Sequence, residues 1–321
     1  MKAITQSVYG DSDVLSLAEV PVPTPGAHDV LVRVRAAGVD RGVWHVMTGT
    51  PTLARLFLGR SAPKEPVRGR DVAGTVEAVG AAVTRFTVGD EVLGTSDGSF
   101  AEFVSVAADR LVSKPPAVSF VDAAALPTSG CAALLAVRDF GHVGAGDRVL
   151  VLGASGGVGS YAVQLAVAAG ATVTGTSSAS KRDLVHSLGA TTALDYATDA
   201  IGTGFDVIID TGSSIPLGEI RHALTRTGRL VIVGAEGGGR VLGGLSRQLA
   251  AGALSPFVSQ KLLGLVSSEK AENLEHLAGL LASGVIRSSV EREFALEDAA
   301  AAIQYLVDGH VRGKVVVVVG D

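Results

Sequence analysis

A run of closely spaced glycines carries the clearest chemistry in the sequence. Residues 148–159 read RVLVLGASGGVG, so an apolar segment leads directly into Gly153, Gly156 and Gly159 at a spacing of three. Apolar residues then recur at helical intervals over 158–169. A strand, a glycine turn and a helix N-terminus bind phosphate, because the helix start offers unpaired N–H groups and glycines admit a pyrophosphate. The predicted cofactor-binding residues here are Gly153, Ser155, Gly156, Gly157, Val158 and Gly159. The alternative is a tight turn in an ordinary α/β unit.

The end of the second strand indicates which cofactor binds. In a dinucleotide fold, an acidic residue roughly 20 positions after the last glycine holds the ribose hydroxyls of NAD. Here the strand at 171–176 ends without an acidic residue, in Ser177 and Ser178, and Lys181 follows. Hydroxyls and a cation suit the 2′-phosphate of NADPH, so we expect NADPH to contact these three side chains. The alternative role for Lys181 is a solvated position in the first turn of a helix.

The elements around these residues alternate between strands and helices. Residues 122–140 are expected to form a helix interrupted near Pro127. Strands predicted at 149–153, 171–176, 206–210 and 229–234 are then separated by helical patterns, the first of them over 157–169. This alternation predicts a doubly wound parallel sheet. Ligands bind at the carboxyl ends of such strands, so the turns after the last two strands are further candidates. These turns contain Thr211 and Gly212, and Val233, Gly234 and Ala235.

The first 126 residues follow a different pattern. Short strand candidates, among them Val30–Ala37, recur at close intervals between prolines and glycines, which is typical of a barrel or sandwich. Residues 50–68, with their prolines and basic residues, are expected to form a loop. A chain of 321 residues is long for a single core, so we expect two domains. Residues 268–321 add two helical patterns and strand candidates near 290–294 and 314–319, and their periodicity does not say which domain they join.

The bulk composition excludes several classes of protein. The net charge of −5 gives no basic surface for nucleic acid. The single cysteine excludes an internal disulfide and fits a reducing compartment. The start, MKAITQSVYG, lacks the apolar core of a signal peptide, and the longest apolar runs have the length of strands. We therefore expect a cytoplasmic protein with neither a nucleic-acid nor a membrane partner.

A series of short motifs runs through the whole chain. They are Gly69-Arg70-Asp71-Val72-Ala73-Gly74, Gly89-Asp90-Glu91-Val92-Leu93-Gly94, Phe100-Ala101-Glu102-Phe103, the Gly153–Gly159 loop, Ser187-Leu188-Gly189-Ala190 and Gly313-Lys314-Val315. In this order they resemble the medium-chain dehydrogenase/reductase superfamily, specifically its zinc-free quinone oxidoreductase branch. The resemblance implies an α/β protein: a GroES-like β-rich catalytic domain, 1–126 completed by 268–321, and a Rossmann NADP-binding domain, 127–267, with the active site in the cleft. It also implies a homodimer joined through Rossmann edge strands, with Leu262–Val266 as the candidate strand.

The same resemblance bears on metal binding. Zinc alcohol dehydrogenases of this superfamily use a Cys and a Gly-His-Glu motif as ligands, and catalytic zinc takes three protein ligands. In this chain Arg70 and Asp71 stand at the His-Glu place, Gly38 or Val39-Asp40 at the Cys place, and the four-cysteine lobe is missing. We therefore expect no metal. Asp71 is then expected to order its own glycine-rich loop through hydrogen bonds to the backbone.

The resemblance also suggests residues that line the active site. Asp40 lies at the mouth of the cleft, where relatives usually carry Asn. An ionised Asp cannot donate a hydrogen bond, so a helix N-cap is the alternative role. Trp44 either covers the nicotinamide or fills the core. Thr128 either contacts the nicotinamide or substrate, or caps a helix. The resemblance also places Tyr196, Phe257 and Lys314 at the cofactor. Lys314 is expected to approach it through its backbone.

These observations together predict an NADPH-dependent oxidoreductase that acts on a small-molecule acceptor. Without a metal, the acceptor must itself spread the negative charge that develops on its oxygen, so quinones and other conjugated carbonyl compounds are the expected substrates. An enone or aldehyde reductase of the same superfamily and a non-catalytic NADPH-binding regulatory protein are the alternatives. A short-chain dehydrogenase is disfavoured, because no tyrosine is followed four residues later by the lysine that such enzymes need.

Overall fold

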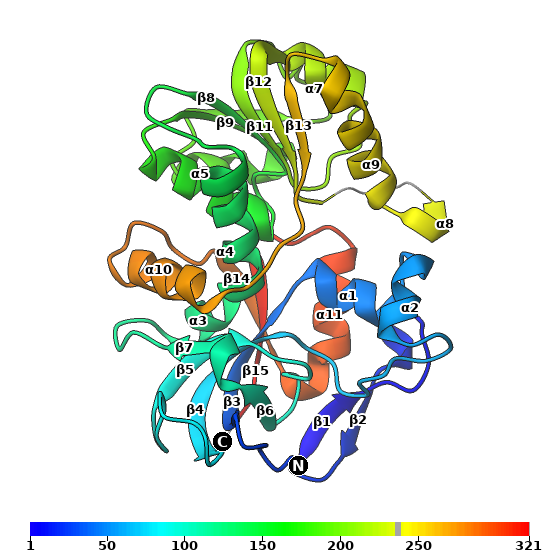
Figure 1. The fold of residues 1–321 in the computed structure, drawn as a ribbon, viewed down its shortest axis with the longest axis vertical. Coiled ribbons are helices and arrows are strands. Elements are labelled where there is room, and N and C mark those ends of the chain that lie inside the picture. Colours follow the sequence, from blue (N-terminus) through cyan, green and yellow to red (C-terminus); the bar gives the residue numbers. More distant parts are fainter. Residues whose placement is uncertain (235–238, 321) are drawn as a thin grey trace. The chain divides into compact units, whose positions relative to one another are not determined.

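The computed structural model describes residues 1–234 and 239–320 (Figure 1). The chain divides into two compact units. The first unit comprises Met1–Cys131 together with the segment from Glu269 to the C-terminus, and the second comprises Ala132–Ser268. Ala235, predicted as a cofactor contact, lies outside the described residues.

The first unit is built on a sheet that joins the two ends of the chain. Its strand order is β14-β15-β3-β4-β5-β7, with β6 also paired to β3. Strand β15 runs antiparallel to β3, with Val315 opposite Val39 and Val318 opposite Ala36. The last segment, which periodicity alone could not assign, therefore lies in the first unit. The strands are β1 (Lys2–Thr5), β2 (Ser16–Glu19), β3 (Asp29–Val39), β4 (Asp71–Val79), β5 (Glu91–Thr95), β6 (Phe103–Ala107), β7 (Leu111–Ser113), β14 (Val290–Ala295) and β15 (Lys314–Val318).

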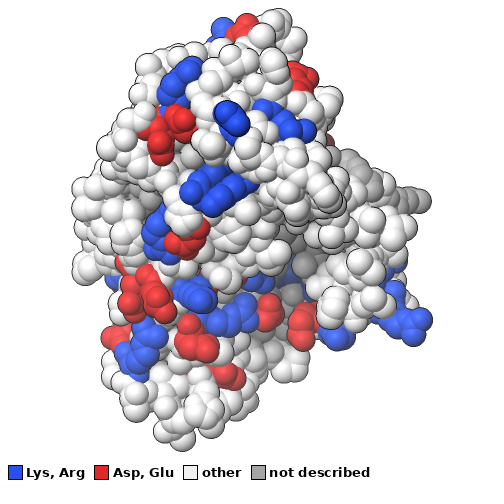
Figure 2. All heavy atoms as spheres, turned by 45° about the horizontal axis from the view of Figure 1, so that its top comes forward, with Lys and Arg blue, Asp and Glu red and all other residues white. Residues whose placement is uncertain are grey.

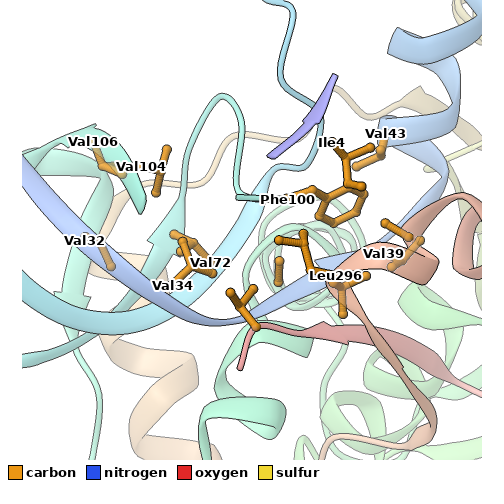
Figure 3. Close-up of a cluster of buried hydrophobic side chains, with 14 of the residues drawn as sticks. Ile4, Val32, Val34, Val39, Val43, Val72, Phe100, Val104, Val106 and Leu296 are labelled. Carbon is orange, nitrogen blue, oxygen red and sulfur yellow. The ribbon is translucent and has the colours of Figure 1, made fainter. Parts of the chain in front are cut away.

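The core of this unit is formed by side chains from distant parts of the sequence. Figure 3 shows Ile4 from β1, Val39 from β3, Val43 and Phe100 near Leu296 of the C-terminal segment, and all five belong to one buried cluster. Burial of each large apolar side chain contributes about 1.5–3 kcal/mol. The C-terminal segment is thus held both by hydrogen bonds to β3 and by this cluster.

The helices of the first unit follow the predicted pattern at Pro127 and differ from it in the segment 50–68. The helical pattern over 122–140 is interrupted at Pro127 as predicted, because proline lacks an N–H and suits the first turn of a new helix. The segment 50–68, predicted as a loop, contains a single helical turn that ends at Gly59 with φ +118°. The helices are α1 (Arg41–Thr48), α2 (Arg55–Leu58), α3 (Phe120–Ala125), α4 (Pro127–Leu134), α10 (Ala271–Ala282) and α11 (Ala299–Val307).

The second unit is a parallel sheet with helices between most successive strands; β10 is joined to β11 without one. Its order, β10-β9-β8-β11-β12-β13, reverses between β8 and β11. In such sheets ligands bind at the carboxyl ends of the strands at this point of reversal. The strands are β8 (Arg148–Leu152), β9 (Thr172–Ser177), β10 (Thr192–Asp195), β11 (Phe205–Asp210), β12 (Leu224–Ile232) and β13 (Lys261–Gly264). The helices are α5 (Gly157–Ala168), α6 (Arg182–Ser187), α7 (Leu217–Ala223), α8 (Gly239–Leu242) and α9 (Leu245–Leu254).

The helices and the surface charge bear on possible membrane and nucleic-acid partners. Within the described residues, no helix is both long and apolar enough to span a lipid bilayer. On the face drawn in Figure 2, basic and acidic side chains are interspersed among uncharged ones. That face therefore does not carry the single-signed field that attracts a polyanion.

Candidate functional site

The glycine turn of the second unit has one glycine that packing requires and one that packing does not. The chain leaves β8 through Gly153, whose φ of +79° favours glycine. A Cβ added at Gly159 would lie 2.1 Å from the Gly153 carbonyl oxygen, so the helix can approach the turn only with glycine there. A Cβ added at Gly156 would meet nothing closer than the same oxygen, at 3.4 Å. The space in front of Gly156 thus fits a ligand that approaches the backbone.

The start of α5 is the anion-binding end of this turn. Gly156 occupies the N-cap position, and no side chain caps the helix. The first-turn N–H groups of a helix lack intrahelical acceptors and lie at the positive end of its dipole. Gly156, Gly157 and Val158 are partly exposed, whereas Ser155 is buried. The structure therefore offers backbone donors rather than side chains at this position.

The neighbouring turn, after β11, is held by a buried carboxylate. Asp210 is fully buried, and its Oδ1 accepts hydrogen bonds from the N–H groups of Gly212 at 3.2 Å and Ser213 at 2.8 Å. Its Oδ2 lies 2.8 Å from Nη2 of Arg247 on α9. The hydroxyl of Thr211 donates to the carbonyl oxygen of Leu152, at 2.7 Å. The predicted contacts Thr211 and Gly212 are thus fixed directly beside the glycine turn.

The turn after β12 is anchored to the same strand end. The N–H groups of Val233 and Gly234 point to the carbonyl oxygen of Asp210, at 2.8 and 3.4 Å. The carboxyl ends of β8, β11 and β12 are therefore linked by hydrogen bonds. This arrangement brings most of the predicted cofactor contacts of the second unit to a single edge of the sheet.

The end of β9 holds the three residues predicted to select the cofactor. Ser177 is buried and its hydroxyl donates to the carbonyl oxygen of Ser178 at 3.0 Å. Ser178 and Lys181 are partly exposed, so they are the more accessible members of the predicted set. The sheet also places Asp195 beside Ser177, but the carboxylate of Asp195 is buried and accepts from the N–H of Ala197 at 3.0 Å.

Two other predicted contacts lie at the surface. Tyr196 is 66% exposed, and its N–H donates to the carbonyl oxygen of Ser177, so its backbone adjoins the end of β9. Phe257 is 84% exposed in the short turn between α9 and β13. Neither side chain is part of the hydrogen-bonded edge described above.

The first unit contains a buried polar cluster centred on Asp71. One oxygen of this carboxyl, Oδ1, accepts both the N–H of Thr128, at 3.1 Å, and its hydroxyl, at 2.5 Å. The other oxygen, Oδ2, lies 3.8 Å from the ammonium nitrogen of Lys314, which donates to the hydroxyl of Ser129 at 3.1 Å. The prediction that Asp71 orders its own glycine-rich loop was therefore wrong. Its hydrogen bonds go to the start of α4, because the neighbouring Gly38 leaves the carboxyl room to reach it.

The environment of Asp71 raises the pKa of its carboxyl from the ordinary 3.8 to about 7. Burial is the main cause, because it penalises the charged form, and the negative charge of Asp40 adds to it. The positive charge of Lys314, the hydrogen bond from Thr128 and the positive charge of Arg70 oppose the shift only in part. Near neutral pH this carboxyl thus exists in both protonation states.

The structure gives Asp40 and Trp44 structural roles. Asp40 is the N-cap of α1, and its Oδ1 accepts the N–H of Val43 at 3.2 Å, which confirms the N-cap alternative. Its Oδ2 is buried and has no hydrogen-bond partner among the described residues. Trp44 is half-buried, packs against the core of the first unit and lies edge-on to His45, with ring centroids 4.9 Å apart.

A cavity of about 220 Å³ lies beside Gly69 and Arg70, the two residues that precede Asp71. Its walls include Val46 of α1 and Phe57 and Leu58 of α2. Arg70, which precedes Asp71, also lines it and is held by Glu269, with 2.6 Å between Nη2 and Oε2. Its lining also includes the charged residues Lys64, Glu65, Arg68 and Asp97. The cavity thus combines apolar walls with charged groups of both signs, which suits a largely apolar compound with a few polar atoms.

Comparison with known proteins identifies the family. A family model described as alcohol dehydrogenase GroES-like domain matches residues 26–116, and one described as zinc-binding dehydrogenase matches residues 188–317. A chloroplastic quinone oxidoreductase of Triphysaria versicolor is 32% identical, over 99% of this chain and 98% of that protein. The chain belongs to the quinone oxidoreductase branch of the medium-chain dehydrogenase/reductase superfamily. The resemblance seen in the sequence is thereby confirmed.

Solved structures of quinone oxidoreductases share the fold over the full chain. The enzyme from Coxiella burnetii has a TM-score of 0.84 at 30% identity and covers 100% of this chain and 99% of its own. The Escherichia coli enzyme, solved in complex with NADPH, has a TM-score of 0.82 at 26% identity and covers 99% and 100%. The predicted fold class is confirmed, and this quinone oxidoreductase family member is an oxidoreductase that uses a nicotinamide cofactor.

The name of the second family model raises the question of metal. Among residues 1–234 and 239–320, no group of three or more His, Cys, Asp or Glu side chains is placed to hold a metal ion. A Cβ added at Gly38, one of the positions compared above with the Cys ligand, would lie 2.4 Å from the carbonyl oxygen of Ala124. An ammonium group, that of Lys314, faces Asp71. The donor set of this quinone oxidoreductase family member therefore does not match a catalytic zinc site.

Proposed function

We propose that the protein is a zinc-independent reductase that uses NADPH to reduce quinones and other conjugated carbonyl compounds. The observation that carries the cofactor assignment is the edge of the second unit. There, α5 begins after β8 without a side-chain cap, and the space at Gly156 is free. Strand β9 is paired with β8, and the residues that follow its end include Ser178 and Lys181. The relatives named for quinone reduction support the acceptor class.

The residues of this edge fit NADPH in two respects. The N–H groups of Gly157 and Val158 would hold the pyrophosphate at the start of α5. The N–H of Gly156 itself donates to the carbonyl oxygen of Gly153 at 3.1 Å, so Gly156 contributes the space through which the phosphates approach. Ser178 and Lys181 would hold the 2′-phosphate of the adenosine ribose, which a carboxylate at the same place would repel. When bound, NADPH supplies a hydride.

The first unit supports a conjugated acceptor. The cavity beside Arg70 is lined by apolar side chains together with charged ones. Among residues 1–234 and 239–320, no metal donor set stands near it to polarise a simple carbonyl. Conjugated acceptors need less such help, since they delocalise the charge that hydride addition places on oxygen. Saturated alcohols and simple ketones are accordingly the poorest expected substrates.

The test is a turnover assay with a panel of quinones, enones and simple aldehydes, followed through the absorbance of reduced cofactor, with NADPH and NADH in parallel. Turnover of quinones with a preference for NADPH supports the proposal. Tight NADPH binding without turnover of any acceptor would instead indicate a regulatory NADPH-binding protein. Stoichiometric zinc, found by elemental analysis of active protein, would refute metal independence.

Assembly and location stay predictions. We propose a homodimer formed through β13, the edge strand of the second sheet, where Val266 is 81% exposed just beyond the strand. We also propose a cytoplasmic location, although three of the relatives are named for the chloroplast. Fractionation of source cells, with the protein detected by antibody, tests the location.

A further inference from the structure

The hydrogen bond between Thr128 and Asp71 can carry a proton in either direction. The two oxygens, Thr128 Oγ1 and Asp71 Oδ1, lie 2.5 Å apart. When Asp71 is ionised, the hydroxyl of Thr128 must donate to it. When Asp71 is protonated, its O–H can donate to Thr128 Oγ1, and the hydroxyl proton of Thr128 is free to point elsewhere.

Thr128 is also the route from this carboxyl to the outside of the unit. Asp71 is fully buried, and so are all residues from 123 to 131 except Thr128, which keeps partial exposure. Thr128 is therefore the accessible residue of the pair, whereas the carboxyl behind it is enclosed. The two residues form a chain of one buried acid and one accessible hydroxyl.

Charged groups on three sides set the protonation of the buried acid. Asp40 at the start of α1 disfavours its charged form, whereas Lys314 on β15 and Arg70 at the start of β4 favour it. Arg70 is itself paired with Glu269, which weakens its influence. The balance, with burial, holds the pKa of Asp71 at about 7, where a group can both give up and regain a proton at neutral pH.

We propose that Asp71 and Thr128 form a proton relay that completes acceptor reduction, an inference that rests on the proposed function. The acceptor gains two electrons as a hydride, and its oxygen then takes the proton of the Thr128 hydroxyl. The proton of the Asp71 carboxyl passes to Thr128 Oγ1 as the first O–H bond breaks. Asp71 is left as a carboxylate facing the ammonium of Lys314, and it regains a proton from solvent through Thr128 after the product leaves.

The relay predicts distinct effects for two substitutions of Thr128. Thr128→Val removes the hydroxyl at nearly constant volume, so kcat for a quinone should fall about a hundredfold, within the range known for general acids, while the Kd for NADPH stays the same. Thr128→Ser keeps the hydroxyl and should restore kcat to within a few-fold of the parent. Thr225→Val, which removes a hydroxyl that bonds Asp206 in the second unit from a residue that is partly exposed like Thr128, is the matched control.

The pH dependence and a spectrum of the ligand-free protein test the acid. In the parent, kcat should fall as the pH rises above about 7, because the relay needs protonated Asp71, and this fall should be absent in Asp71→Asn. The infrared spectrum of the ligand-free parent should contain a carboxylic-acid carbonyl band that disappears with the same midpoint and is missing from Asp71→Asn.

The outcomes separate the relay from the function on which it rests. Parent-like kcat in Thr128→Val, an unchanged pH profile in Asp71→Asn, or an infrared spectrum without the band would each overturn the relay. Absence of turnover by the parent with every acceptor would overturn the proposed function, and the relay with it, even if the infrared band shows Asp71 protonated. If Asp71→Asn does not fold, the kcat values of Thr128→Val and Thr128→Ser and the infrared titration of the parent still test the relay.

Discussion

Arg247 of α9 lies 2.8 Å from the buried carboxylate of Asp210 at the end of β11, and so joins a helix to the turn at the sheet edge. Asp210 is fully buried, and the side chain of Arg247 is 15% exposed. A charge pair in such a place stabilises mainly because loss of one partner leaves the other charge buried and unpaired.

Arg247→Met should therefore lower the free energy of unfolding by about 3–5 kcal/mol, as measured by urea denaturation. It should also weaken NADPH binding, because Asp210 positions Gly212 and Ser213. Arg33→Met, which breaks the exposed pair with Glu77, is the control and should change stability by less than about 1 kcal/mol. Equal effects of both substitutions would contradict the structural role assigned to Arg247.

Two glycines of the same turn should respond differently to alanine. Gly159→Ala places a Cβ 2.1 Å from a carbonyl oxygen, so it should destabilise the fold by about 1–3 kcal/mol or more. Gly156→Ala has room for the Cβ within the protein and should melt near the parent temperature. It should nevertheless raise the Kd for NADPH about tenfold, equivalent to about 1.4 kcal/mol. Calorimetry measures the melting temperature and fluorescence titration the Kd for NADPH. Unchanged NADPH affinity in Gly156→Ala would show that the pyrophosphate does not bind at Gly156.

Lys181→Ala should weaken NADPH binding about tenfold and leave NADH binding unchanged, since only NADPH carries the 2′-phosphate. Lys261→Ala, on the exposed edge strand β13, removes a cation from the same unit and should change neither affinity. Fluorescence titration of both proteins with both cofactors checks this. A parallel loss for NADH would show that Lys181 supports the helix rather than the phosphate.

Asp71 should make stability depend on pH in an unusual direction. Because its pKa is higher in the folded protein, about 7 against 3.8, folding binds a proton here, and this contribution is present at low pH and lost as the pH rises toward 7. Between about pH 4 and 7, the parent should thus lose stability relative to Asp71→Asn, and above about pH 7 the difference should level off. Urea midpoints at a series of pH values test the trend, and a constant difference would disprove it.

The proposed dimer should be sensitive to charge at the end of β13. Val266→Lys should reduce the mass in solution to that of a single chain, because pairing of two edge strands would bury the new cation. Val285→Lys changes an exposed valine of the other unit and should leave the mass unchanged. Light scattering after gel filtration measures both, and a parent that is already a monomer would end the dimer proposal.

Local features of this fold were predictable from the sequence because they depend on neighbouring residues. The apolar run Val149–Leu152 is a fully buried strand, and Pro127 separates two helices, as predicted. The glycine spacing that precedes α5 placed the start of that helix to the residue. In each case the signal and its structural cause lie within a few positions of each other.

Contacts between distant residues were not predictable in the same way. The pairing of Arg247 with Asp210 and of Lys314 with Asp71 depends on which elements pack together, and no spacing in a single sequence records that. Lys314 had been expected to act through its backbone, yet its ammonium is the buried counter-charge of Asp71. Gly38 lies inside β3, one residue beyond the strand predicted at 30–37, and a glycine within a strand is typical of close approach by another group, here Asp71.

The position of β15 beside β3 also constrains how the protein is made. During synthesis, the first 131 residues emerge with β4 and β6 but without β15, which pairs with the end of β3, and without Leu296 of their core. The second unit is continuous in sequence and can fold as soon as it leaves the ribosome. The first unit can therefore complete its sheet only after the last residues of the chain have been synthesised. A nascent chain interrupted before residue 314 leaves the end of β3 without β15, and such an unpaired strand edge favours aggregation.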